Sequence, residues 1–163
     1  MTDGRAPRAY LGLGSNLGDR LRYLRDAVAT LSEVGRTRVS SVYETAPVGG
    51  PEDQGPYLNL AVELRTDRTP RDLLGVCHRL EAAAGRVRDV RWGPRTLDVD
   101  VLWVEGATVA EPDLEVPHPR MWERRFVMAP LHELAPDLFE RAAVDASEGY
   151  VEPVGALDSL QGT

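Results

Sequence analysis

The chain contains no lysine, because all 19 of its Lys/Arg residues are arginine. This absence excludes a P-loop lysine, a Schiff-base lysine and a lysine general base. Any phosphate binding must therefore rely on arginine, histidine, a metal ion or backbone N–H groups. Codon usage in a GC-rich genome would explain the absence equally well, but the chemical exclusion holds in both cases.

Cysteine and long apolar runs are also scarce. The single cysteine, Cys77, cannot form an internal disulfide and has no partner cysteines for a zinc site. No apolar run approaches the roughly 20 residues that cross a membrane, and the N-terminus lacks the apolar stretch of a signal peptide. We therefore expect a cytoplasmic protein. A net charge of −7 argues against nucleic acid as a partner, and a length of 163 residues suits a single domain over 1–163.

Apolar periodicity predicts four strands and two helices. Strands are expected at 9–14, 39–45, 57–64 and 97–104, and helices at 19–34 and from Thr69 to Gly85. In the third strand, alternation turns Leu58, Leu60, Val62 and Leu64 to one face and Tyr57, Asn59 and Glu63 to the other. The order β-α-β-β-α-β is the α+β, ferredoxin-like pattern. It predicts an antiparallel sheet with helices on one face and C-terminal additions, and leaves the other face covered only by loops.

The remaining segments carry weaker patterns. Residues 112–119 look irregular, 121–134 look partly helical with Pro130 near a helix start or break, and the tail beyond Phe139 shows no pattern. The glycines of 12–18 do not have dinucleotide-loop spacing, so we interpret them as a strand-to-helix turn, with Ser15 or Asn16 helping to cap the helix. His78 and His132 are interpreted as ordinary helix residues.

The segment 86–100 is the most informative part of the chain. Residues 85–95 carry four arginines against one acid, although the whole chain is acidic. Arginine forks bind phosphate oxygens, and Gly85 and Gly93 give this loop freedom to close. Asp98 and Asp100 follow at i and i+2 on a predicted strand, where they share a face and suit Mg²⁺. The arginines are Arg86, Arg88, Arg91 and Arg95, and they flank Trp92.

Two further features suit a flat, phosphorylated ligand. Tyr57 and Asn59 share the sheet face opposite the core, where stacking and amide hydrogen bonds could recognise a heterocycle. His118 lies between two prolines in a rigid, extended segment, and Arg120, Arg124 and Arg125 follow it. An ordinary solvated sheet face and an exposed loop histidine remain alternatives for these features.

These motifs occur together, in order, in a known family. The stretches GLGSNLGDR, YLNLAV, GRVR-x₂-RWGPRTLDVD and VPHPRM-x₂-R-x-FV cover roughly residues 9–138. The chain resembles the 6-hydroxymethyl-7,8-dihydropterin pyrophosphokinases of folate biosynthesis. The resemblance implies that pyrophosphate passes from ATP to the pterin hydroxymethyl group, giving AMP, in a monomer that uses two Mg²⁺ ions.

The resemblance also implies roles for individual residues. The catalytic group would be Arg86, Arg88, Arg95, Asp98 and Asp100, with Asp98 and Asp100 holding the metal ions. ATP would contact Glu81, Arg88, Trp92, Arg95, Val101, His118 and Arg124. The pterin would contact Thr45, Ala46, Val48, Tyr57, Asn59, Trp92, Asp98 and Phe126.

Small departures affect the loops. The loop between Arg88 and Arg91 is one residue shorter than in some relatives, the 48–55 loop is one residue longer, and Pro119 follows the histidine. Two other functions stay open from the residues alone. One is a Mg²⁺-dependent nucleotide hydrolase that uses the same groups, and the other is a non-catalytic binding module.

Overall fold

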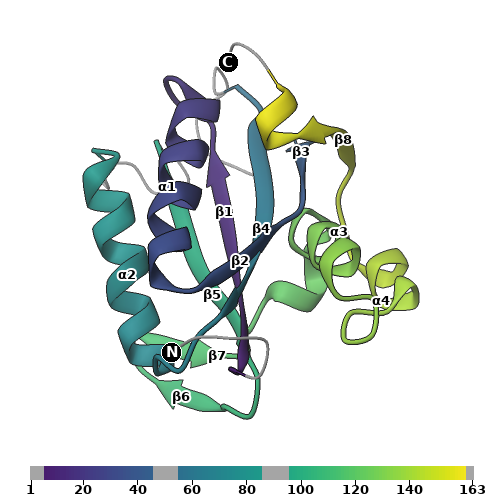
Figure 1. Ribbon diagram of the computed structural model, residues 1–163. Coiled ribbons are helices and arrows are strands. Elements are labelled where there is room, and N and C mark those ends of the chain that lie inside the picture. Colours follow the sequence, from purple (N-terminus) through teal and green to yellow (C-terminus); the bar gives the residue numbers. More distant parts are fainter. Residues whose placement is uncertain (1–5, 46–54, 86–95, 161–163) are drawn as a thin grey trace.

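The computed structural model describes residues 6–45, 55–85 and 96–160. Its first part alternates strands and helices in the order that the periodicity predicts (Figure 1). The elements are β1 (Arg8–Ser15), α1 (Arg20–Val34), β2 (Arg36–Val39), β3 (Ser41–Thr45), β4 (Tyr57–Arg65), α2 (Pro70–Ala83) and β5 (Asp98–Val104). The C-terminal part adds β6 (Val109–Glu111), β7 (Leu114–Val116), a 3₁₀ turn at Met121–Glu123, α3 (Arg125–Leu134), α4 (Arg141–Ala146), β8 (Val151–Ala156) and a 3₁₀ turn at Leu157–Ser159.

The main sheet is antiparallel, with the strand order β5-β1-β4-β3-β8 and β2 paired to β4. The expected second strand is split into β2 and β3 at Ser40, whose hydroxyl accepts a hydrogen bond from the Ala61 amide at 2.9 Å. With β2 and β3 counted as one strand, the first four strands have the spatial order 4-1-3-2 of a split β-α-β fold. The predicted α+β, ferredoxin-like fold class is therefore confirmed.

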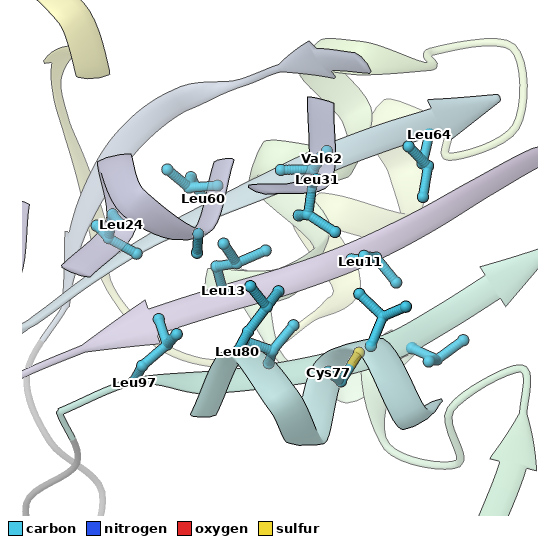
Figure 2. Packing of buried hydrophobic residues seen from close by; sticks show 14 of the residues in the cluster. Leu11, Leu13, Leu24, Leu31, Leu60, Val62, Leu64, Cys77, Leu80 and Leu97 are labelled. Carbon is cyan, nitrogen blue, oxygen red and sulfur yellow. The ribbon is translucent and has the colours of Figure 1, made fainter. Parts of the chain in front are cut away.

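Helices α1 and α2 pack on one face of the sheet (Figure 1). Their core faces combine with Leu58, Leu60, Val62 and Leu64 of β4, the residues that alternation points inward. Cys77 of α2 lies within this core, and burial raises the pKa of its thiol (Figure 2). Each helix begins where a side chain caps it, since Asp19 accepts from the Arg22 amide and Thr69 from the Asp72 amide. The cap of α1 is thus Asp19, and the expectation of Ser15 or Asn16 is wrong.

The opposite face carries a second apolar layer, so the expectation that only loops cover it is wrong. Helices α3 and α4 lie against it (Figure 1). The layer buries Met121, Met128, Leu131 and Phe139 against Tyr10 of β1. Pro130 lies within α3 rather than at its start or at a break. The helix tolerates the missing N–H because burial of Met128, Leu131 and Leu134 holds it to the sheet.

Polar side chains attach the C-terminal additions. The carboxylate of Glu133 on α3 accepts hydrogen bonds from the Tyr43 hydroxyl at 2.7 Å and the Ser41 amide at 2.8 Å, both on β3. Arg125 donates to four backbone carbonyls, two within α4 and two in the segment between α4 and β8. Helix α4, strand β8 and the β6–β7 hairpin lie where the sequence indicated irregular chain. No helix in the described part of the chain is both long and apolar enough to cross a membrane.

Mutation of Phe139 tests whether this second layer stabilises the sheet. The Phe139 ring is fully buried and meets the Tyr10 ring edge-on, with centroids 5.3 Å apart. We expect Phe139→Ala to lower the free energy of unfolding by about 3–5 kcal/mol, because it leaves a cavity between layers. Trp122→Ala is the control, since Trp122 also contacts Phe139 but is 45% exposed. Urea unfolding should show a much smaller loss for it, and equal losses would mean that α3 and α4 do not stabilise the sheet.

Candidate functional site

Two carboxylates lie side by side on the edge strand β5. Asp98 and Asp100 alternate with Val99 and Val101, which are buried beneath α1 and α2. Residues two apart on a strand are separated by roughly 6.6–6.8 Å, so the two carboxylates face the same region of space. The face assignment made from the sequence is therefore confirmed for both pairs.

A pocket of about 330 Å³ opens beside these carboxylates, at the free edge of β5. One wall is the face of α2, the opposite wall is the β6–β7 hairpin, and β5 forms the floor. Its described lining contains five acids against two histidines, so its field favours cations. The lining residues are Leu74, His78, Glu81, Asp98, Val99, Asp100, Val101, Pro112, Asp113, Leu114, Glu115, His118 and Pro119.

Glu81 connects α2 to the edge of the sheet. Its side chain is 4% exposed, and it accepts a hydrogen bond from the Val99 amide at 2.9 Å. On an edge strand this amide has no neighbouring strand to pair with, and a buried amide needs a partner. Glu81 therefore completes the sheet edge while it lines the pocket, which the sequence pattern did not indicate.

His118 is held in one orientation at the mouth of the pocket. Its amide donates to the Leu102 carbonyl at 2.8 Å, and its Nδ1 accepts from the Arg120 amide at 3.2 Å. Because Nδ1 accepts, the proton of the neutral ring lies on Nε2, which is then free to donate. Burial, followed by the charge of Arg124, lowers the pKa of His118. This shift favours the neutral ring, whose Nε2–H can donate.

The neighbouring arginines Arg124 and Arg125 make different contacts and therefore have different roles. Arg124 lies over the Phe126 ring, with its guanidinium carbon 5.7 Å from the ring centroid. Burial is the main cause that lowers the pKa of Arg124, whereas the charges of Asp98 and Asp100 act to raise it. Arg124 therefore lies close enough to both acids to interact with them electrostatically. Arg125 is instead engaged by the carbonyls near α4. Only the first of the pair contributes charge to the site.

A polar row crosses the sheet beside the pocket. In the strand register Gly14 lies opposite Asp98 on one side and Asn59 on the other. The Asn59 amide donates to the Thr45 hydroxyl at 2.8 Å. A Cβ at position 14 would lie 2.7 Å from Asn59 Oδ1 and 3.5 Å from the Tyr57 ring. Gly14 thus keeps this surface open, which corrects the interpretation of Gly12 and Gly14 as turn residues, since both lie within β1.

The structure accounts for part of the expected site. It places Glu81, Asp98, Asp100, Val101 and His118 at the pocket, and Thr45, Tyr57 and Asn59 on the adjacent sheet face. Arg124 and Phe126 lie at the start of α3. Ala46, Val48, Arg86, Arg88, Arg91, Trp92 and Arg95 lie outside the described residues.

Sequence reasoning missed several pocket residues. His78 was interpreted as an ordinary helix residue, yet it lines the pocket, whereas His132 bonds to the Phe139 carbonyl. The spacing of His78, four residues after Leu74 and three before Glu81, would have shown that the three share a helix face. Asp113 and Glu115 lay in a segment expected to be irregular.

The carboxylate pair fits a hard divalent cation. Within residues 6–45, 55–85 and 96–160, no group of three or more His, Cys, Asp or Glu side chains is arranged to hold a metal ion. Two aspartates are nevertheless a typical protein contribution to Mg²⁺, which usually keeps waters and takes substrate phosphates as its other ligands. The donor set therefore suits Mg²⁺ better than zinc, which prefers nitrogen and sulfur ligands.

Comparison with known sequences identifies one family. Residues 10–136 match the family described as 7,8-dihydro-6-hydroxymethylpterin-pyrophosphokinase, HPPK. A 2-amino-4-hydroxy-6-hydroxymethyldihydropteridine pyrophosphokinase from Bacillus subtilis is 50% identical over 137 residues, covering 82% of this chain and 81% of the relative. Its counterpart from Methylorubrum extorquens is 52% identical over 134 residues, covering 80% and 84%.

Solved structures support the fold. An HPPK-DHPS in complex with substrates aligns with a TM-score of 0.62 at 13% identity, covering 86% of this chain and 45% of that chain. The wild-type HPPK-DHPS of Plasmodium falciparum aligns with a TM-score of 0.58 at 14% identity, covering 80% and 41%. The chain thus spans less than half of these longer proteins, and at such low identity the likeness concerns the fold alone.

The short distance between a Cβ at position 14 and the Asn59 side chain allows the geometry of the polar row to be tested. Gly14→Ala places a Cβ against Asn59 Oδ1, so the Asn59–Thr45 hydrogen bond has to shift. We expect a loss of about 1–3 kcal/mol in unfolding free energy and a displaced Asn59 side-chain amide signal in NMR spectra. Gly75→Ala within α2 has room for its Cβ and should instead stabilise by about 0.5–1 kcal/mol. An unmoved Asn59 signal in Gly14→Ala would contradict the close contact.

Proposed function

The chain belongs to the 7,8-dihydro-6-hydroxymethylpterin-pyrophosphokinase family, and from this premise we propose how its residues divide the work. It transfers pyrophosphate to 6-hydroxymethyl-7,8-dihydropterin in folate biosynthesis, the activity by which the family is named. In our proposal ATP is the donor, Mg²⁺ is required, AMP leaves, and the protein works as a cytoplasmic monomer formed by one domain.

The observation that carries the proposal is the position of Asp98 and Asp100. They line the pocket at the edge of β5, and Asp98 is also in register with Gly14 and Asn59 on the open sheet face. Neighbouring strands are about 4.8 Å apart, so a group held by Asp98 lies within about 10 Å of Asn59. The carboxylates thus stand between a pocket sized for a nucleotide and a polar surface suited to a flat heterocycle.

In this arrangement Asp98 and Asp100 would hold two Mg²⁺ ions, whose charge would offset the negative charge of the triphosphate. His118 offers its Nε2–H to a phosphate oxygen, and Arg124 adds positive charge nearby. Glu81 and Val101 line the nucleotide side of the pocket. Arg86, Arg88 and Trp92 remain predicted members of a closing loop, and Arg95 remains a predicted contact of the ATP phosphates; all four lie outside the described residues.

The pterin side is proposed to use the open sheet face. Thr45 orients the Asn59 amide, which leaves donor and acceptor positions for the ring edge. Tyr57 and Phe126 supply aromatic surface for stacking. Ala46, Val48 and Trp92 complete the predicted pterin contacts, outside the described residues.

The reaction needs positioning more than covalent catalysis. The hydroxymethyl oxygen bonds to the β-phosphorus as the bond from that phosphorus to the α–β bridging oxygen breaks, and the hydroxyl proton passes to solvent. The side chains orient both substrates and leave the phosphates surrounded by donors. A nucleotide hydrolase would require instead that water take the acceptor's place.

A direct assay separates these possibilities. AMP should form from ATP and Mg²⁺ only when hydroxymethyldihydropterin is present. AMP formation at the same rate without the pterin would favour the hydrolase, and calorimetric binding of both ligands without turnover would favour a binding module.

The aspartates should be essential for turnover but not for folding. We expect Asp98→Asn and Asp100→Asn each to lower kcat by about a hundredfold or more, because each removes a charged metal ligand. Thermal unfolding should change little, since both side chains are only partly buried. Asp26→Asn, an exposed acid on α1, is the control. Wild-type turnover in both variants would refute the metal assignment.

The adjacent arginines should show opposite defects. Arg124→Met keeps the packing on Phe126 but removes charge, so we expect kcat/KM to fall about tenfold to a hundredfold with little change in melting temperature. Arg125→Met leaves several carbonyls without their donor and should cost about 1–3 kcal/mol in stability. Activity and urea denaturation measure the two effects, and the same profile for both variants would contradict the assignment.

A further inference from the structure

Arg71 lies in the first turn of α2, at the outer end of the pocket-facing side of that helix. It precedes Leu74 by three residues and His78 by seven, spacings that place all three on one helix face. Leu74 and His78 line the pocket, but Arg71 itself does not. Its side chain instead reaches the opposite wall.

The guanidinium of Arg71 binds both acids beside the turn of the β6–β7 hairpin. Its Nη1 donates to Asp113 Oδ2 at 2.7 Å and its Nη2 to Asp113 Oδ1 at 3.0 Å, a bidentate fork. Nη2 also donates to Glu111. This contact holds the pKa of the Asp113 carboxyl below its ordinary value. Figure 1 shows the hairpin lying at the N-terminal end of α2, where this arginine stands.

The β6–β7 ladder, which pairs Glu111 with Leu114, closes the turn but does not tie it to α2. Leu114 and Val116 of β7 are buried in the core, but Glu111, Pro112 and Asp113 are exposed. Pro112 and Asp113 nevertheless line the pocket. Among the described residues, the contacts of Arg71 with Asp113 and Glu111 therefore tie this exposed turn to α2.

Arg71 also affects the charge of the pocket. Asp113 lines the pocket, and an unpaired carboxylate at this position would repel a triphosphate. A metal ion would offset the two aspartates of β5, but not Asp113. The fork from Arg71 neutralises that acid at the rim.

We propose that Arg71 is a positioning residue for the nucleotide, which clamps the β6–β7 turn as the outer wall of the pocket and cancels the charge of Asp113. The inference rests on the proposed function, in which this pocket receives ATP. Arg71 does not touch the substrate, so its effect falls on nucleotide affinity and not on the chemical step.

Steady-state kinetics test the proposal. Arg71→Ala should raise KM for ATP about threefold to fivefold at low salt, the range expected for an exposed ion pair. The value of kcat and the KM for the pterin should stay within about twofold, and the difference should shrink as ionic strength rises. Arg71→Lys, which keeps the charge without the fork, should be intermediate. Adding Asp113→Asn to Arg71→Ala should recover part of the lost affinity, because it removes the carboxylate charge that Arg71 no longer cancels, while the clamp remains lost.

The matched control is Arg22→Ala, which removes an exposed arginine paired with Asp26 on α1, away from the pocket. A readout without substrate is hydrogen exchange over residues 109–116, which should quicken in Arg71→Ala and not in Arg22→Ala. If the wild type is active and Arg71→Ala has the same KM for ATP as Arg22→Ala, the clamp is refuted and the proposed function stands. A parallel fall of kcat and melting temperature would also overturn it, by showing a general loss of stability. No turnover by the wild type would refute the proposed function, and the clamp with it.

Discussion

In the pairing of β5 with β1, Asp100 lies opposite Gly12 and Asp98 opposite Gly14. This register turns both carboxylates to the open face while Val99 and Val101 enter the core. A slip of one residue would exchange the two sets, bury two charges and expose two valines. The apolar core therefore enforces the position of the acids, and the pocket, the polar row and the proposed metal site all follow from that position.

The face that carries the site is divided between stability and binding. Toward one end, Tyr10, Ala61 and Leu102 are covered by α3 and its neighbours. Toward the other end, the same strands present Gly14, Asn59 and Asp98. The covered half supplies apolar burial that a two-helix layer alone would lack, and the open half can remain polar because it does not have to stabilise the fold. Glu133 attaches α3 to β3, and Arg125 attaches α3 to α4 and to the segment after it.

Periodicity predicted the elements that have a clear apolar face. It located α1, α2, β4 and β5 to within a residue or two, because large apolar side chains recur in them at every second position or at every third and fourth position. It failed for β6, β7 and β8, which are short or mostly exposed; β6 and β7 pair only with each other, and β8 pairs with the distant strand β3. The prediction that Pro130 starts or breaks a helix was wrong for a related reason. Burial of α3 stabilises the helix by more than the hydrogen bond that a proline removes.

The sequence by itself determined the order of the main elements, the sharing of one strand face by Asp98 and Asp100, and the concentration of arginine before them, since these follow from local spacing and charge. Only the tertiary structure decided that α3 and α4 cover half of the second face, that Glu81 closes the edge of β5, and that Arg71 reaches across to Asp113. These features join residues far apart in the chain, and no local pattern encodes such contacts, because they arise when separate elements pack around the same core.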